Sequence, residues 1–111
     1  MDTYGNTKII NYANLHNHTQ FSNCSCGFID CMNKEDDLIK EAIKLGYSGI
    51  AITDHECLSA MVRVEQLMDK MKQDEKELNF KVVYGNEIYL AREDMSKDTY
   101  KSGDKFYHFM L

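Results

Sequence analysis

The sequence has 111 residues, a formal net charge of −5, 43% hydrophobic residues and 28% charged residues, as expected for one small globular domain. The acidic balance and the lack of a lysine- or arginine-rich stripe argue against a segment that holds nucleic acid by its own charge. The sequence has no run of about 18 apolar residues, so we expect no membrane span, and its N-terminus lacks the layout of a signal peptide. We therefore expect a cytoplasmic protein whose four cysteines are reduced thiols.

The first predicted strand covers residues 9–15 and leads into a pair of histidines. Apolar residues mix with asparagines in this stretch, and His16 and His18 follow it directly. Residues two apart in a strand point to the same side, so the two imidazoles would face one space. Two imidazoles in one space suit a metal ion, although a lone His-x-His is a weak signal. Residues 19–33 are predicted to form a loop.

A helix is predicted over residues 33–45, with Asn33 as its N-cap. Three acidic residues at positions 35–37 suit the first turn, where the helix dipole favours negative charge. Apolar residues then recur at three- and four-residue spacing and make one apolar face. Gly46 follows this pattern at the position where a helix commonly ends.

Residues 49–53 are a continuous apolar run, which is typical of a strand buried on both faces. Asp54 and His55 come directly after this run. A second helix is predicted from residue 59 to about residue 76, with a methionine-rich inward stripe. Such a stripe is typical of core packing, and a binding groove is the less favoured interpretation.

Two more strands are predicted in the C-terminal third. One covers residues 80–84, continues in extended form and is followed by Glu87. Residues 92–104 are charged and predict a loop or a hairpin excursion, and residues 105–111 form a fourth strand that contains His108. Strands that alternate with helices predict an α/β fold with a mainly parallel sheet and right-handed crossovers.

The histidines and one glutamate fall on strands or strand ends of this predicted sheet. Functional groups gather at the carboxyl ends of parallel strands, so the candidate metal ligands are His16, His18, His55, Glu87 and His108. Imidazoles and carboxylates suit Zn²⁺, Mn²⁺ or Fe²⁺, and Glu87 could bridge two ions. Two ions about 3.5–4 Å apart form a clamp that cleaves phosphoesters. Asp54 is a candidate for orienting an imidazole through its free N–H.

Two rival sites involve the cysteines. The group of Cys24, Cys26 and Cys31 is a possible metal site, but it lacks the repeated C-x₂₋₄-C pair that marks structural zinc. Cys57 and His55 are a conceivable nucleophile pair. The only residue that could orient the histidine of this pair is Asp54, which is already assigned to the metal cluster.

Several of these stretches resemble the PHP (polymerase and histidinol phosphatase) domain. They cover residues 14–22, 38–46, 49–55, 84–87 and 107–108. The His-x-His, Thr-Asp-His and Gly-x-Glu elements are weak one by one but specific in this order and spacing. The closest likeness is to the N-terminal PHP domain of the bacterial DNA polymerase III α subunit, including phage-type versions.

The resemblance implies that residues 1–111 are the N-terminal portion of a distorted (β/α)7 barrel with two or three metal ions at its strand ends. It implies metal ligands at His16, His18, His55, Glu87 and His108, with Asp30 as the best candidate for an acidic ligand after the first pair. Zn²⁺, Mn²⁺ and Fe²⁺ are the expected ions, with Mg²⁺ as a further option. The family's later ligands and its polymerase motifs are missing from these residues. We therefore expect a truncated chain that shows little or no turnover alone.

Three functional hypotheses follow from the resemblance. The first is a PHP segment of a DNA polymerase III α subunit, a DNA-directed DNA polymerase and nucleotidyltransferase. In the intact protein the segment would act on DNA as a metal-dependent phosphoesterase or 3′–5′ exonuclease, beside other polymerase domains or replisome subunits. The second is a stand-alone phosphoesterase of the histidinol-phosphatase type, and the third is a non-catalytic PHP scaffold.

Overall fold

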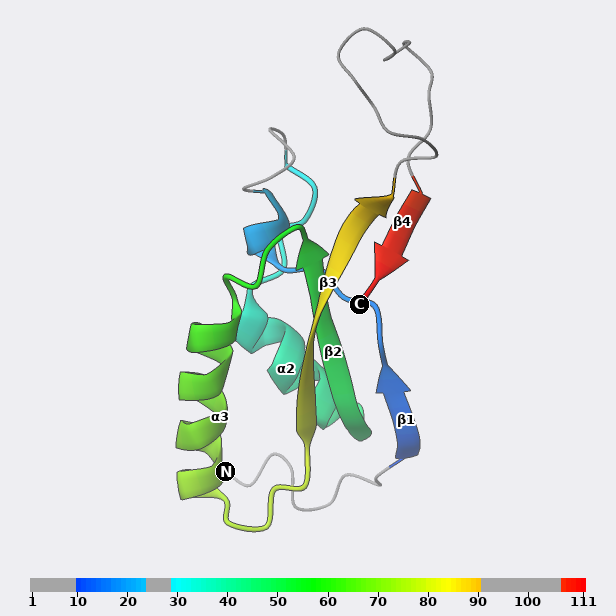
Figure 1. Cartoon of the computed structure of the whole chain (residues 1–111). Coiled ribbons are helices and arrows are strands. Elements are labelled where there is room, and N and C mark those ends of the chain that lie inside the picture. The colour runs from blue at the N-terminus through cyan, green and yellow to red at the C-terminus, as the bar shows by residue number, and fades with distance from the viewer. Residues whose placement is uncertain (1–9, 24–28, 91–106) are drawn as a thin grey trace, which may run out of the picture.

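The computed structural model describes residues 10–23, 29–90 and 107–111. The elements are β1 (Ile10–Asn14), the 3-10 helix η1 (Gln20–Ser22), α2 (Glu35–Lys44), β2 (Tyr47–His55), α3 (Met61–Asp74), β3 (Lys81–Leu90) and β4 (Tyr107–Met110). Figure 1 shows one twisted sheet with the two α-helices beside it. Cys24, Cys26 and the predicted excursion over residues 92–104 lie outside the described residues.

The sheet is a four-stranded mixed sheet with the order β1-β2-β3-β4 in the part of the chain that the structure describes. β2 pairs in parallel with both β1 and β3, as expected for strands joined through helices. β4 runs antiparallel to β3, so the prediction of mainly parallel strands holds for the first three strands only. A parallel fourth strand would need a crossover, and the charged sequence between β3 and β4 lacks the apolar periodicity of a crossover helix.

The two helices pack on the same face of the sheet and form the core with it (Figure 1). The buried core residues are Ile39, Ala42, Ile43, Ile50, Ile52, Ala60, Val64, Met68 and Phe80. Met68 is buried and Met71 packs against the cluster, so these two methionines of the α3 stripe serve the core. Among the described residues, no helix is both long enough and apolar enough to cross a membrane.

The N-terminal boundary of α2 differs from the prediction. Lys34 occupies the N-cap position and makes no side-chain cap, whereas Asn33 precedes it and accepts a hydrogen bond from Gln20 through its backbone carbonyl. The acidic residues of the first turn, at positions 35–37, take over the stabilisation of that end. Gly46 follows the C-cap with a φ of 82°, as predicted for a residue that ends a helix.

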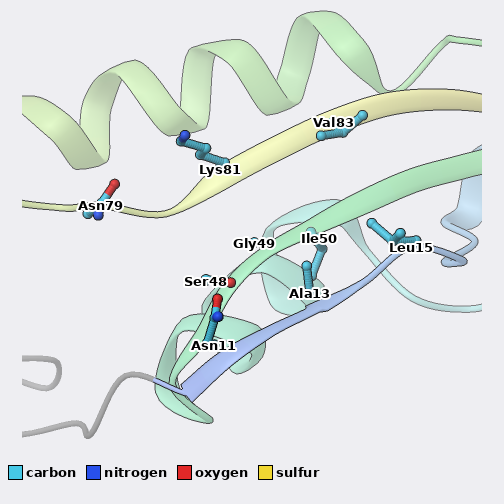
Figure 2. A pocket seen from close by; sticks show the side chains of 9 residues that line it. All are labelled: Asn11, Ala13, Leu15, Ser48, Gly49, Ile50, Asn79, Lys81 and Val83. Carbon is cyan, nitrogen blue, oxygen red and sulfur yellow. The ribbon is translucent and has the colours of Figure 1, made fainter.

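The sheet face away from the helices carries a shallow pocket of about 360 Å³ between β1 and β3 (Figure 2). Gly49 of β2 lies at its floor and pairs with Lys81. A Cβ on Gly49 would lie 2.5 Å from the backbone carbonyl oxygen of Lys81, which cannot move without disturbing the strand pairing.

We therefore expect Gly49→Ala to lower the free energy of unfolding by roughly 1–3 kcal/mol, the usual cost of overpacking. Urea unfolding followed by circular dichroism measures this change. Ser48→Ala on the same strand is the control, because it removes one hydrogen bond, to the Tyr12 carbonyl, and adds no atoms. Equal stability of the two variants would contradict the predicted clash.

Candidate metal centre

The strand register brings three of the predicted ligands to one edge of the sheet. His55, the last residue of β2, pairs with Glu87 of β3, and His108 of β4 pairs with Tyr89. Paired residues on neighbouring strands share a face, and so do residues two apart on one strand. The side chains of His55, Glu87, Tyr89 and His108 therefore occupy the same face.

His16 and His18 approach this edge from the segment that follows β1. The strand ends at Asn14, so the two histidines lie past the strand rather than inside it. Asn17 lies between them and is tied to β2: its amide donates to the carbonyl oxygen of Ala51 at 2.9 Å, and its backbone carbonyl accepts from the Thr53 N–H at 2.8 Å. With Asn17 fixed on β2, both imidazoles reach Glu87.

Glu87 is the centre of the arrangement and is 2% exposed. Its Oε2 lies 3.0 Å from His16 Nε2 and 2.6 Å from His18 Nε2, while the two imidazole nitrogens are 3.1 Å apart. Its Oε1 lies 2.6 Å from His108 Nδ1, and His55 Nδ1 is 3.9 Å from Oε2. The two carboxylate oxygens thus face different histidines.

Asp30 joins the same cluster from the loop before α2. Its Oδ2 lies 3.4 Å from His55 Nε2 and 3.7 Å from His18 Nδ1. His16, His18 and Glu87 form one group whose ligand atoms all lie within 4.8 Å of one another and could hold a metal ion, and His18, Asp30 and His55 form a second. The structure therefore brings all six predicted ligands together.

The electrostatic setting of Glu87 favours its charged form. Burial by itself raises the pKa of this carboxyl group, but the surrounding histidines outweigh that effect. Hydrogen bonds from His16 and His108 and the charges of His55 and His18 hold the pKa of Glu87 below its ordinary value. Glu87 thus presents a negative charge to the space that it shares with the imidazoles.

The donor set fits a divalent cation. In a tetrahedral site with bonds of 2.0–2.1 Å, neighbouring ligand atoms are about 3.3 Å apart. The three atoms of the first group, His16 Nε2, His18 Nε2 and Glu87 Oε2, are separated by 2.6, 3.0 and 3.1 Å. The two longer separations are close to this spacing, and the 2.6 Å contact is shorter. Two imidazole nitrogens and one carboxylate oxygen are ligands that Zn²⁺, Mn²⁺ and Fe²⁺ accept.

The contacts of Asp54 differ from those predicted for it. Its carboxylate accepts hydrogen bonds from the Thr19 backbone N–H at 2.6 Å, the Thr19 hydroxyl at 2.8 Å and the Ser22 hydroxyl at 2.8 Å. Successive residues of a strand point to opposite faces, so Asp54 points away from the face that carries His55. Its route to an imidazole runs through Ser22, whose Oγ is 2.9 Å from His18 Nδ1.

Ser22 and Tyr89 are site residues that the sequence analysis missed. The Tyr89 ring is parallel to His55, with centroids 5.5 Å apart, and its hydroxyl lies 3.2 Å from His55 Nδ1. It also meets His108 edge to face at 4.8 Å. The signal for Tyr89 was available, because it is two residues beyond Glu87 on the same strand face; Ser22 carried no such signal.

The described cysteines take part in backbone contacts. The thiol of Cys57 donates to the Phe21 carbonyl at 3.5 Å, and the thiol of Cys31 donates to the His18 carbonyl at 3.1 Å. Both thiols thus help to hold the segment of residues 18–22, which carries His18 and Ser22. These contacts give no support to a Cys57–His55 nucleophile pair.

Comparison with known proteins points to one family. The PHP domain family matches residues 14–111. The chain is 39% identical over 99 residues to the probable DNA polymerase YorL of Bacillus subtilis and to a DNA-directed DNA polymerase of Bacillus phage SPbeta, covering 86% of this chain and 7% of each relative. It is 38% identical over 58 residues to the error-prone DNA polymerase of Cutibacterium acnes, covering 52% of this chain and 5% of that protein. The chain spans less than a tenth of the length of these relatives, and it belongs to the PHP domain family.

Proposed function

We propose that this chain is the N-terminal part of a (β/α)7 PHP barrel in a polymerase of the DNA polymerase III α type, and that its histidine and acidic cluster is part of a metal-dependent phosphoesterase site. The observation that carries the proposal is the convergence of His16 and His18 on one oxygen of the buried Glu87. The names of the relatives, which are DNA polymerases, support the polymerase context. Residues 1–111 would then form one domain portion in a longer protein.

Two sets of ligands follow from the contacts. His16, His18 and one oxygen of Glu87 would hold one ion, while Asp30 and His55, which form a group with His18, would hold a second. The other oxygen of Glu87 faces His108, which makes His108 a further candidate ligand. When bound, such ions would neutralise charge on a phosphoryl group and make a water molecule more nucleophilic. The nitrogen-rich donor set favours Zn²⁺, Mn²⁺ or Fe²⁺ over Mg²⁺.

A substrate would approach from the side of the exposed imidazoles. The side chains of His16 and His108 are 49% and 53% exposed, whereas that of Glu87 is 3% exposed. Glu87 thus contacts the histidines from the buried side of the cluster, and the exposed parts of the His16 and His108 rings remain accessible to a phosphate group. The net charge of −5 makes it unfavourable for this chain to hold DNA unaided, so we assign DNA binding to other parts of the longer protein.

The reaction proposed for the whole protein is phosphodiester cleavage at a 3′ end, as in a 3′–5′ exonuclease that works in the cytoplasm beside the polymerase. The residues of this chain would contribute the first ligands of that site. We expect little or no turnover from the 111 residues alone, since the resemblance places further ligands later in the family's sequence. Hydrolysis of a small phosphomonoester by the chain alone would instead favour a stand-alone phosphatase.

Metal titration of the purified chain tests the proposal. We expect the chain to bind Zn²⁺ or Mn²⁺ with a stoichiometry of at least about one, and the variant His16→Ala/His18→Ala to lose that binding. Asn79→Ala/Lys81→Ala is the matched control, because it removes two polar side chains from the pocket beside the start of β3 and leaves the cluster intact. Equal binding by all three proteins, or none by the unmodified chain, would overturn the metal site.

A further inference from the structure

Ser22 lies between Asp54 and His18 in a buried chain of hydrogen bonds. Its hydroxyl donates to Asp54 Oδ1 at 2.8 Å, and the same Oγ is 2.9 Å from His18 Nδ1. Ser22 is 0% exposed and Asp54 is 1% exposed, so water does not compete for these contacts. The backbone N–H of His55 also donates to Ser22 Oγ, at 3.1 Å.

Proton accounting along this chain fixes which nitrogen of His18 carries hydrogen. A carboxylate only accepts hydrogen bonds, so the single proton of the Ser22 hydroxyl is donated to Asp54. Ser22 Oγ then acts as an acceptor toward His18, which requires a proton on Nδ1. Nε2 is then the nitrogen that can offer a lone pair to an ion.

Nε2 of His18 faces the first ligand group. It lies 2.6 Å from Glu87 Oε2 and 3.1 Å from His16 Nε2, the two other atoms of that group. In the metal-free chain the Glu87 carboxylate accepts a hydrogen bond from Nε2 at this distance, and metal binding would release that proton. Asp30, in contrast, comes closest to His18 at Nδ1, at 3.7 Å, which is the nitrogen already used by Ser22. His18 therefore belongs with His16 and Glu87, and Asp30 is left to act with His55.

We propose that Ser22 and Asp54 are positioning residues that keep a proton on Nδ1 of His18, so that Nε2 is the nitrogen that binds the ion. Thr19 fixes the far end of the chain, because its backbone N–H and its hydroxyl both donate to the Asp54 carboxylate. The proposal rests on the metal site described under Proposed function. The proton on Nδ1, however, is a property of the chain before any ion binds.

The ¹⁵N NMR spectrum of the histidine rings tests the tautomer directly. We expect His18 to keep a protonated Nδ1 both with chelator present and with Zn²⁺ bound, and its Nε2 to be unprotonated when Zn²⁺ is bound. An unprotonated Nδ1 in either state would overturn the proposal. This measurement requires no substitution, so it does not depend on whether a variant folds.

Ser22→Ala tests the consequence for binding. We expect His18 to lose its fixed tautomer and the affinity for Zn²⁺ to fall by about 10- to 100-fold, as is usual when a group that orients a metal-binding histidine is removed. Ser48→Ala is the matched control: it removes a hydroxyl of β2 that donates to the Tyr12 carbonyl, outside the cluster, and should change neither property. Unchanged tautomer and affinity in Ser22→Ala would overturn the proposal while leaving the metal site standing. An Nδ1–H tautomer in a chain that binds no metal would support the tautomer assignment and overturn the proposed function.

Discussion

Glu87→Gln is expected to weaken the binding of Zn²⁺ or Mn²⁺ by about 100-fold or more, the largest effect of any single substitution in the cluster. Removing a group that only orients a ligand lowers metal affinity by about 10- to 100-fold. Removing a ligand that also contacts several histidines should lower the affinity more. Oε2 of Glu87 faces His16 and His18, and Oε1 faces His108. Glutamine removes the negative charge and places an N–H₂ group, which donates only, against imidazole nitrogens.

Isothermal titration with metal measures this loss. Glu65→Gln is the matched control, because Glu65 is an exposed glutamate on α3 and its change to glutamine is chemically the same. We expect the control to bind as the unmodified chain does. An affinity of Glu87→Gln within a few-fold of the unmodified chain would contradict the central role of Glu87 in the proposed site.

The fold could be predicted where burial leaves a periodic pattern. Apolar spacing placed both helices within about two residues of their observed ends, and the run at residues 49–53 lies inside β2. The direction of β4 could not be predicted in this way. All four of its residues are exposed, so they carry no alternation that would indicate a partner, and strand direction depends on the connection rather than on composition.

The candidate site was predictable to the extent that its residues lie on strands or directly beside them. His55 and Glu87 are paired neighbours in the sheet, which the sequence order strand–helix–strand already implies. Ser22 was not predictable, because the 3-10 helix η1 brings it between His18 and Asp54 through local turns. The sequence did not predict that Asp54 reaches His18 through Ser22, because adjacent residues of an extended strand face opposite ways and Asp54 points away from His55.

Ile39→Ala is expected to lower the free energy of unfolding by about 3 kcal/mol, within the range of about 2–5 kcal/mol for removing a large buried aliphatic side chain. Ile39 is 0% exposed and packs in the cluster between the helices and β2. Urea unfolding with chelator present measures the change. Ile39→Val should cost only about 0.5–1.5 kcal/mol, and Leu45→Ala, at a position that is 53% exposed, is the surface control.

Adding metal to the same variants distinguishes the stability of the core from metal binding at the ligand cluster. A ligand that binds only the folded chain stabilises it by about 2.7 kcal/mol at a concentration of 100 times Kd. We expect saturating Zn²⁺ to stabilise the unmodified chain and Ile39→Ala by similar amounts, because Ile39 lies in the core on the helix-covered face of the sheet. Glu87→Gln should gain little stability from the metal, because it lacks the carboxylate that faces the histidines. The comparison is made at urea concentrations where Ile39→Ala is still folded. If Zn²⁺ did not stabilise Ile39→Ala under these conditions, the core and the ligand cluster would form one cooperative unit, contrary to this expectation.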